Sequence, residues 1–137
     1  MKKLLLILAA LSFALCSCSP RVASSLPSET IPEEHPDYAV IYFYRTRNFV
    51  KTPYDVYLGD QAVYRSKDRS KAVVKVDKPG KYEVWAKTET RESIVLDIEP
   101  GKDYYVKTYV GMGVVIYRPL LMPVPRETAL AEMRAIR

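Results

Sequence analysis

Short apolar runs separated by turn residues dominate the chain after its N-terminal quarter. Residues 39–45 form one run that is apolar up to its last residue, Arg45, whereas apolar and polar positions alternate in residues 71–77, 82–86 and 94–98. A period of two places alternate side chains on opposite faces of a β-strand, so these segments predict strands with one buried and one solvated face. The continuous run is long and hydrophobic enough to predict a central strand.

Turn residues between these runs predict how the strands connect. Gly59-Asp60 has Gly at the first central position of a two-residue loop, which suits a type II′ hairpin. Pro79-Gly80 and Pro100-Gly101 each precede a strand, and Pro followed by Gly suits a type II turn. The remaining predicted strands are residues 54–58, 61–65, 104–110 and 114–117.

The C-terminal segment departs from the strand pattern. It contains three prolines, Pro119, Pro123 and Pro125. Because proline lacks a backbone donor, we expect these residues to forbid regular strand pairing. Residues 127–136 then change to helical spacing, which predicts a short helix that covers part of a sheet. The expected fold is therefore mainly β: an antiparallel β-sandwich of about seven or eight strands with a short C-terminal helix.

The N-terminus has the three-part pattern of an export signal. Two lysines precede an apolar run over residues 4–15, which is shorter than the roughly 20 residues that a membrane-spanning helix needs. The run ends in Leu15, Cys16, Ser17 and Cys18. This order resembles the lipobox of bacterial lipoproteins, and the resemblance implies cleavage before Cys18 and acylation of that cysteine. The alternative, an ordinary signal with two bystander cysteines, is disfavoured because charge, length and cysteine position all agree.

A spacer is expected between the modified cysteine and the sandwich. Residues 19–37 contain four prolines among Ser, Thr and Glu, and they would reach about 60 Å if fully extended. We therefore predict a signal peptide in residues 1–17 and a lipidated Cys18 with its Pro/Ser-rich tether in residues 18–37. The β-sandwich domain with its C-terminal helix follows in residues 38–137.

Net charge bears on the class of partner, and cysteine content bears on how the mature domain is stabilised. The chain has 21 Lys and Arg against 16 Asp and Glu, and loss of Lys2 and Lys3 with the signal leaves 19 − 16 = +3. Arg65, Lys67, Arg69 and Lys71 cluster where they would meet lipid phosphates or a carboxylated cell-wall polymer, although Asp68 dilutes the cluster and favours a plain solvated loop. We expect no nucleic-acid partner. The mature domain has no cysteine beyond Cys18, so packing alone must stabilise it.

The residues needed for catalysis do not form a recognisable pattern. The one histidine, His35, falls in the spacer, which argues against a Ser-His-Asp arrangement and a histidine metal site. Asp97, Glu99 and Asp103 surround the second Pro-Gly turn, and strand alternation places Asp97 and Glu99 on the solvated face. A hydrolase that uses Asp97 and Asp103 is therefore the least favoured alternative. We expect no enzyme activity, no cofactor and no metal.

An aromatic strip is the sharpest candidate for a binding site. If Tyr82, Val84 and Ala86 point inward, Trp85 points outward, and the same alternation applied to residues 104–110 turns Tyr105 and Tyr109 outward. The candidate binding residues are Trp85, Tyr105, Tyr109, Lys87 and Lys107. Such a strip suits stacking on a sugar ring or contact with a partner protein. The alternative is that the Pro-rich tail and C-terminal helix cover this face, or that it belongs to the second half of the sandwich core.

Four stretches of the predicted sandwich resemble a known family. They are residues 41–45, 56–60, 76–82 and 99–106, and their most telling parts are the two Pro-Gly turns and the pair Tyr104-Tyr105. Together they resemble a family of small bacterial lipoproteins, known as a domain of unknown function and distantly like the PEGA modules of cell-surface proteins. The resemblance implies a β-sandwich envelope domain without catalytic residues.

These observations predict a non-enzymatic lipoprotein of the bacterial envelope. Its anchor at Cys18 holds it to a membrane, and its sandwich is expected to bind an envelope protein or a cell-wall glycan. A carbohydrate-binding module that uses the aromatic strip is the alternative. Ser19 is not the Asp that holds many lipoproteins at the inner membrane, and no acidic run follows it, so we expect the outer membrane and a periplasmic orientation.

Overall fold

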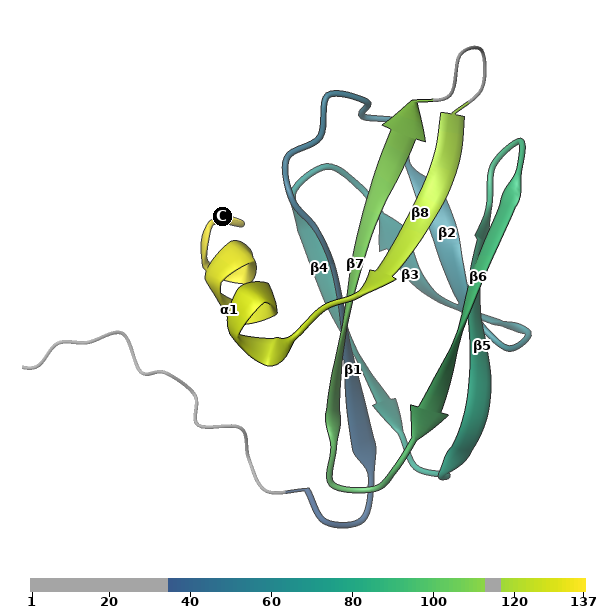
Figure 1. Ribbon diagram of the computed structural model, residues 1–137, viewed down its shortest axis with the longest axis vertical. Helices are drawn as coiled ribbons and strands as arrows, with labels where there is room; N and C mark the ends of the chain where they lie inside the picture. Colours follow the sequence, from purple (N-terminus) through teal and green to yellow (C-terminus); the bar gives the residue numbers. More distant parts are fainter. Residues whose placement is uncertain (1–34, 113–116) are drawn as a thin grey trace, which may run out of the picture. The chain divides into compact units, whose positions relative to one another are not determined.

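Two four-stranded sheets make up most of the computed structural model, which describes residues 35–112 and 117–137 (Figure 1). The first sheet contains, in spatial order, β4 (Ser70–Val76), β1 (Ala39–Arg45), β7 (Asp103–Met112) and β8 (Tyr117–Pro123). The second sheet contains β3 (Gln61–Ser66), β2 (Tyr54–Leu58), β5 (Gly80–Lys87) and β6 (Arg91–Ile98). Helix α1 (Arg126–Arg134) follows β8. The predicted β-sandwich with a C-terminal helix is confirmed.

One strand pair departs from the antiparallel arrangement that the sequence predicted. Strands β1 and β7 pair in parallel, with Val40 opposite Asp103 and Tyr44 opposite Lys107. Five strands separate β1 from β7 along the chain, and four of them belong to the second sheet, while β4 belongs to the first. Because both strands enter from the same end of the sandwich, they run side by side in one direction.

The continuous apolar run of β1 is buried on both faces of its sheet. Ile41 and Phe43 point into the core between the two sheets, where they pack with residues of the second sheet such as Val56 and Val84. Tyr44 points the other way and joins a second apolar cluster beneath α1. A strand covered on both sides needs apolar side chains at consecutive positions, and this explains why the run does not alternate.

The predicted hairpin and one of the two predicted Pro-Gly turns have the expected backbone. Gly59 has φ 57° while Asp60 keeps a negative φ, which is the combination of signs that a type II′ turn requires. Gly101 has φ 75°, close to the value of about 80° that a type II turn requires at this position. Gly80 has φ 141° and already belongs to β5, so the first Pro-Gly pair does not form that turn.

The proline-rich segment forms a strand, contrary to the prediction. Strand β8 pairs with β7 in antiparallel register and contains both Pro119 and Pro123. It lies at the edge of the first sheet, where one side of the strand needs no hydrogen-bond partner and proline is tolerated. Three of the four residues in the predicted strand 114–117 lie outside the described residues, and Tyr117 begins β8.

Helix α1 confirms the change of period near the C-terminus. It ends at Arg134, and the following Ala135 and Ile136 donate backbone hydrogen bonds to its last turn. Ala129 and Ile136 are buried against the outer face of the first sheet. Among the described residues, no helix has the length and apolar content to cross a bilayer.

Candidate functional site

The predicted aromatic strip is divided between the two outer faces of the sandwich. Trp85 lies on β5 in the second sheet, whereas Tyr105 and Tyr109 lie on β7 in the first. The inward neighbours of Trp85, Val84 and Ala86, are fully buried, so the indole points away from the core as predicted. The prediction of a single strip is nevertheless wrong. Alternation identifies the face of a strand on which a residue lies, and not the sheet to which the strand belongs.

Helix α1 buries the tyrosine at the centre of the predicted strip. Tyr105 is 6% exposed and packs with Ala129 and Ile136. Its ring stacks on Tyr42, with centroids 4.9 Å apart and planes inclined by 11°. Tyr109 is half-buried opposite Leu120 of the edge strand. The alternative in which the helix covers this face is therefore correct for Tyr105, and no sugar ring can stack on it.

A carboxylate of α1 holds the helix to the first sheet. Lys107 Nζ donates to Glu132 Oε1 at 2.6 Å, and the Tyr44 hydroxyl donates to Glu132 Oε2 at 2.7 Å. Partial burial opposes ionisation of Glu132, but the bonds from Lys107 and Tyr44 outweigh it and lower the pKa of Glu132. Burial also raises the pKa of Tyr44. Lys107 therefore stabilises the packing of α1 on the first sheet, and its ammonium group does not serve as a donor for a ligand.

Trp85 is clamped between two neighbours on the outer face of the second sheet. The Tyr57 ring stacks on it with centroids 4.2 Å apart and planes inclined by 8°. The Arg91 guanidinium carbon lies 4.4 Å from the Trp85 centroid. Tyr57 lies on β2 and Arg91 on β6, the two strands on either side of β5, so the two groups approach the indole from opposite sides. The Trp85 Nε1 also donates to the Gly59 carbonyl at 2.7 Å, so the ring has a fixed orientation.

The surroundings of Trp85 combine apolar and paired charged groups. Val95 is 67% exposed on the neighbouring strand, and Arg91 forms an ion pair with Glu83 at 2.9 Å. Lys87 is exposed at the end of β5 opposite Arg91. We call the surface made by Tyr57, Trp85, Arg91 and Val95 the Trp85 face. No segment in the described part of the chain packs over it.

His35 belongs to the folded domain, although the sequence placed it in the spacer. It is 8% exposed, and its ring stacks on Tyr38 with a centroid distance of 4.7 Å. Its Nε2 lies 2.8 Å from Asp103 Oδ1, and its Nδ1 lies 2.8 Å from the Tyr38 carbonyl oxygen. No local pattern reveals this contact, since Asp103 follows 68 residues later.

Both nitrogens of His35 face acceptors, which favours the doubly protonated ring. The bond to the Tyr38 carbonyl and, against the effect of burial, the Asp103 carboxylate raise the pKa of His35 above its usual 6.5. The Tyr105 hydroxyl touches the other oxygen of Asp103 at 3.5 Å. With both nitrogens occupied, His35 has no free position from which to act as a general base.

The carboxylates near the second Pro-Gly turn do not converge. Asp97 and Glu99 are exposed, as the strand alternation predicted, and Glu99 pairs with Lys102 at 2.6 Å. Asp103 is bound to His35. Among residues 35–112 and 117–137, no three His, Cys, Asp or Glu side chains are grouped so that they hold a metal ion. The arrangement therefore offers no support for the hydrolase alternative.

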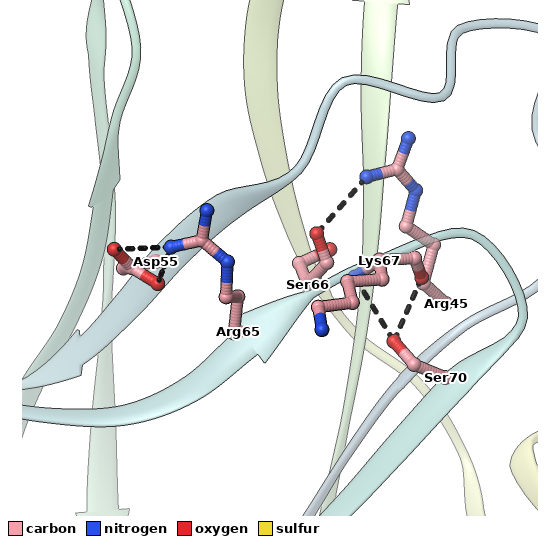
Figure 2. Close-up of polar contacts among 6 residues, drawn as sticks. All are labelled: Arg45, Asp55, Arg65, Ser66, Lys67 and Ser70. Carbon is pink, nitrogen blue, oxygen red and sulfur yellow. Dashed lines mark hydrogen bonds and ion pairs between the residues drawn. The ribbon is translucent and has the colours of Figure 1, made fainter.

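A loop at one end of the sandwich holds a phenylalanine in solvent. Residues 46–53 join β1 to β2, and Phe49 at their centre is 94% exposed. The fully buried Arg45 lies at the base of this loop and donates to the carbonyl groups of Val50 and Thr52. Figure 2 shows the same guanidinium reaching Ser66, whose carbonyl oxygen lies 3.3 Å away. We call residues 46–53 the tip loop.

Asn48 fixes the tip loop to two neighbouring segments. Its side chain accepts from the Val50 amide at 3.1 Å and donates to the Val110 carbonyl at 3.2 Å. Its backbone amide donates to Asp68 Oδ1 at 2.8 Å, and this bond links the tip loop to the turn between β3 and β4. Lys67 and Arg69 flank Asp68 and are exposed. Arg65, by contrast, is paired with Asp55 at 3.0 Å (Figure 2).

A shallow depression lies on the tip loop. It is lined by Arg47, Asn48, Phe49 and Lys51. Sequence reasoning missed this site, because the loop has no motif of its own. The available signal was an arginine at the end of an otherwise apolar strand, followed closely by Phe49 between two cations.

The comparisons with known proteins add little to this geometry. A scan against protein-family models and a search of curated proteins found no match. The chain is similar in structure to the N-terminal domain of AlgF from P. aeruginosa, at 18% sequence identity and a TM-score of 0.44. The similarity covers 65% of this chain and 95% of that chain.

Proposed function

We propose that this chain is a lipid-anchored lipoprotein of the bacterial envelope whose β-sandwich is a non-enzymatic binding domain for an envelope protein. The anchor half of the proposal rests on the order Leu15, Cys16, Ser17 and Cys18 at the end of an export signal. The resemblance of the chain to small bacterial lipoproteins stays a prediction. The binding half rests on one observation, the open Trp85 face.

The two outer faces of the sandwich differ in how they are covered. The chain packs its own helix on the first sheet through Ala129 and Glu132. The second sheet displays Val95, Trp85 and Tyr57 with no described segment over them. Trp, Tyr and Arg, which lie together on this face, are the residue types that most often carry the binding energy at protein interfaces.

The geometry around Trp85 favours a protein over a sugar. A sugar ring needs a free aromatic face, and both faces of the Trp85 indole are occupied by Tyr57 and Arg91. A protein partner needs a preorganised patch of mixed character, and the bond from Trp85 to Gly59 holds such a patch in place before binding. Cell-wall glycan therefore becomes the lesser candidate.

Two exposed valines provide a matched test of the Trp85 face. Val95 is 67% exposed on the outer face of the second sheet, and Val73 is 65% exposed on the outer face of the first. A photo-crosslinking amino acid at position 95 should give a discrete crosslinked protein in intact cells, and the same group at position 73 should not. Equal crosslinking at both positions, or none at position 95, would contradict the proposal.

The anchor is tested by fractionating cells that express cysteine variants. Cys18→Ala should move the protein out of the membrane fraction, because it removes the acylated thiol. Cys16→Ala is the control and should leave the protein in the membrane fraction, since a small residue still precedes Cys18. We also propose the outer membrane, facing the periplasm, and separation of the two membranes on a density gradient tests that placement.

A further inference from the structure

We propose that the tip loop docks on an anionic phospholipid bilayer by burying Phe49 among the lipids while its cations meet lipid phosphates. The inference rests on the proposed membrane anchor, and it concerns a surface separate from the Trp85 face. The protein would then contact the membrane at two points, the acylated Cys18 and the tip loop.

Phe49 is exposed to solvent on a loop that several hydrogen bonds hold in place. It is 94% exposed, although the loop that carries it is bonded to Arg45, Val110 and Asp68. An exposed aromatic side chain on a fixed loop loses little conformational freedom when it binds. Aromatic rings partition favourably into the interfacial layer of a bilayer, where their apolar body is buried.

The charge around Phe49 matches an anionic surface. Loops 46–53 and 67–69 carry four exposed cations, Arg47, Lys51, Lys67 and Arg69, and one carboxylate. That carboxylate, Asp68, accepts from the Asn48 amide. The buried Arg45 beneath the loop bonds carbonyl groups, so in the described part of the chain no carboxylate cancels its charge. Each cation near an anionic bilayer adds to the attraction.

The size of the tip favours a lipid surface over a folded protein. The depression beside Phe49 is lined by only four residues. A stable protein interface buries about 800 Å² on each partner, which is far more than one side chain and a small depression provide. Membrane attachment needs only a small inserted apolar group, a few cations and a second anchor.

The tether is long enough for the tip and the anchor to share one bilayer. Strand β1 starts beside His35 and ends at Arg45, so the tip loop lies at the end of the sandwich opposite to the point where the chain enters. The longest strand, β7, has 10 residues and spans about 33 Å. The 16 residues between Cys18 and His35 reach about 55 Å when extended.

The test uses the full acylated protein reconstituted into vesicles that contain brominated lipids. Phe49→Trp places a reporter at the tip, and the wild-type protein, with Trp85 as its one tryptophan, gives the background. In vesicles with one third phosphatidylglycerol the added tryptophan should be quenched, and in pure phosphatidylcholine it should not. Val73→Trp is the matched control at an exposed site away from the tip and should stay unquenched in both.

Neutralising the tip loop separates charge from insertion. Arg47→Gln combined with Lys51→Gln should lower the ratio of docked to undocked protein about fivefold per cation, hence about 25-fold for the pair. Absence of quenching in anionic vesicles, or equal quenching in neutral ones, would overturn the inference. Flotation of the wild-type protein with neutral vesicles reports the anchor alone, so failure of the anchor and failure of the tip give different results.

Discussion

Arg45 connects the core of the sandwich to the tip loop through a single side chain. It follows Ile41 and Phe43 at the next inward position of β1, where an apolar residue would be expected. Its guanidinium instead satisfies three carbonyl groups, and it lies 5.7 Å from the centroid of the Tyr54 ring. Its Nε has no partner in the described part of the chain. The loop conformation therefore depends on a buried cation.

Replacing Arg45 tests this dependence. Arg45→Met should lower the free energy of unfolding by about 3 kcal/mol, because the carbonyl groups of Val50, Thr52 and Ser66 lose their donor. Arg47→Met, at an exposed position of the same loop, should change it by less than about 0.5 kcal/mol. Urea unfolding of both variants measures the difference. Similar stabilities for the two variants would show that Arg45 does not support the loop.

His35 makes stability depend on pH in a defined direction. Its pKa is raised in the folded protein above the usual 6.5, through the bonds to Tyr38 and Asp103. Such a group stabilises the fold fully below pH 6.5, and the contribution disappears as the pH rises through the raised value. The stability difference between the wild-type protein and His35→Gln should therefore shrink from pH 6 to pH 9 in urea unfolding. A difference that stays constant or grows would contradict the assigned pairing.

Neither Arg45 nor His35 was recognisable as a structural residue in the sequence. Arg45 looks like the polar end of a strand, and His35 looks like part of a spacer rich in proline. Their partners lie up to 21 and 68 residues away. Contacts of this kind depend on which strands meet in space, and local periodicity carries no information about that.

At the scale of elements, the apolar pattern predicted most strands correctly, but the expectation that proline forbids strand pairing was wrong. Alternation in β4, β5 and β6 identified the inward residues, and the continuous run of β1 identified a central strand. Strand β8 was missed because proline was taken to exclude strand pairing, whereas it excludes only a donor on one side. At a sheet edge that loss is tolerated.

Docking of α1 should depend on Glu132. Glu132→Gln removes the ion pair with Lys107 and weakens the bond from Tyr44, both in a partly buried setting. We expect the free energy of unfolding to fall by about 1 kcal/mol and the amides of α1 to exchange faster, while those of β5 remain protected. Hydrogen exchange at constant pH measures both. Unchanged exchange in α1 would mean that apolar packing alone holds the helix.

The same carboxylate predicts loosening of the helix in acid. The pKa of Glu132 is lowered from 4.5 in the folded protein, so its contribution is present above pH 4.5 and is lost as the pH falls through the lowered value. The stability gap between wild type and Glu132→Gln should therefore close on acidification. A gap that persists below the lowered pKa would assign the effect to packing.

At the scale of the whole molecule, the fold class was predictable and the grouping of surface residues was not. Trp85 and Tyr105 each point outward from their strands, as expected, but they belong to different sheets. Which strand joins which sheet follows from long-range pairing, of which the parallel contact of β1 with β7 is the clearest case. The predicted binding strip therefore becomes the Trp85 face on one side and a helix-covered face on the other.

The central claim is that the chain is a lipoprotein anchored through Cys18, and metabolic labelling with a fatty acid tests it most directly. Cells that express the wild-type chain or Cys16→Ala should incorporate labelled palmitate into this protein, and cells that express Cys18→Ala should not. Absence of label from the wild-type protein, or label that survives Cys18→Ala, would contradict the account.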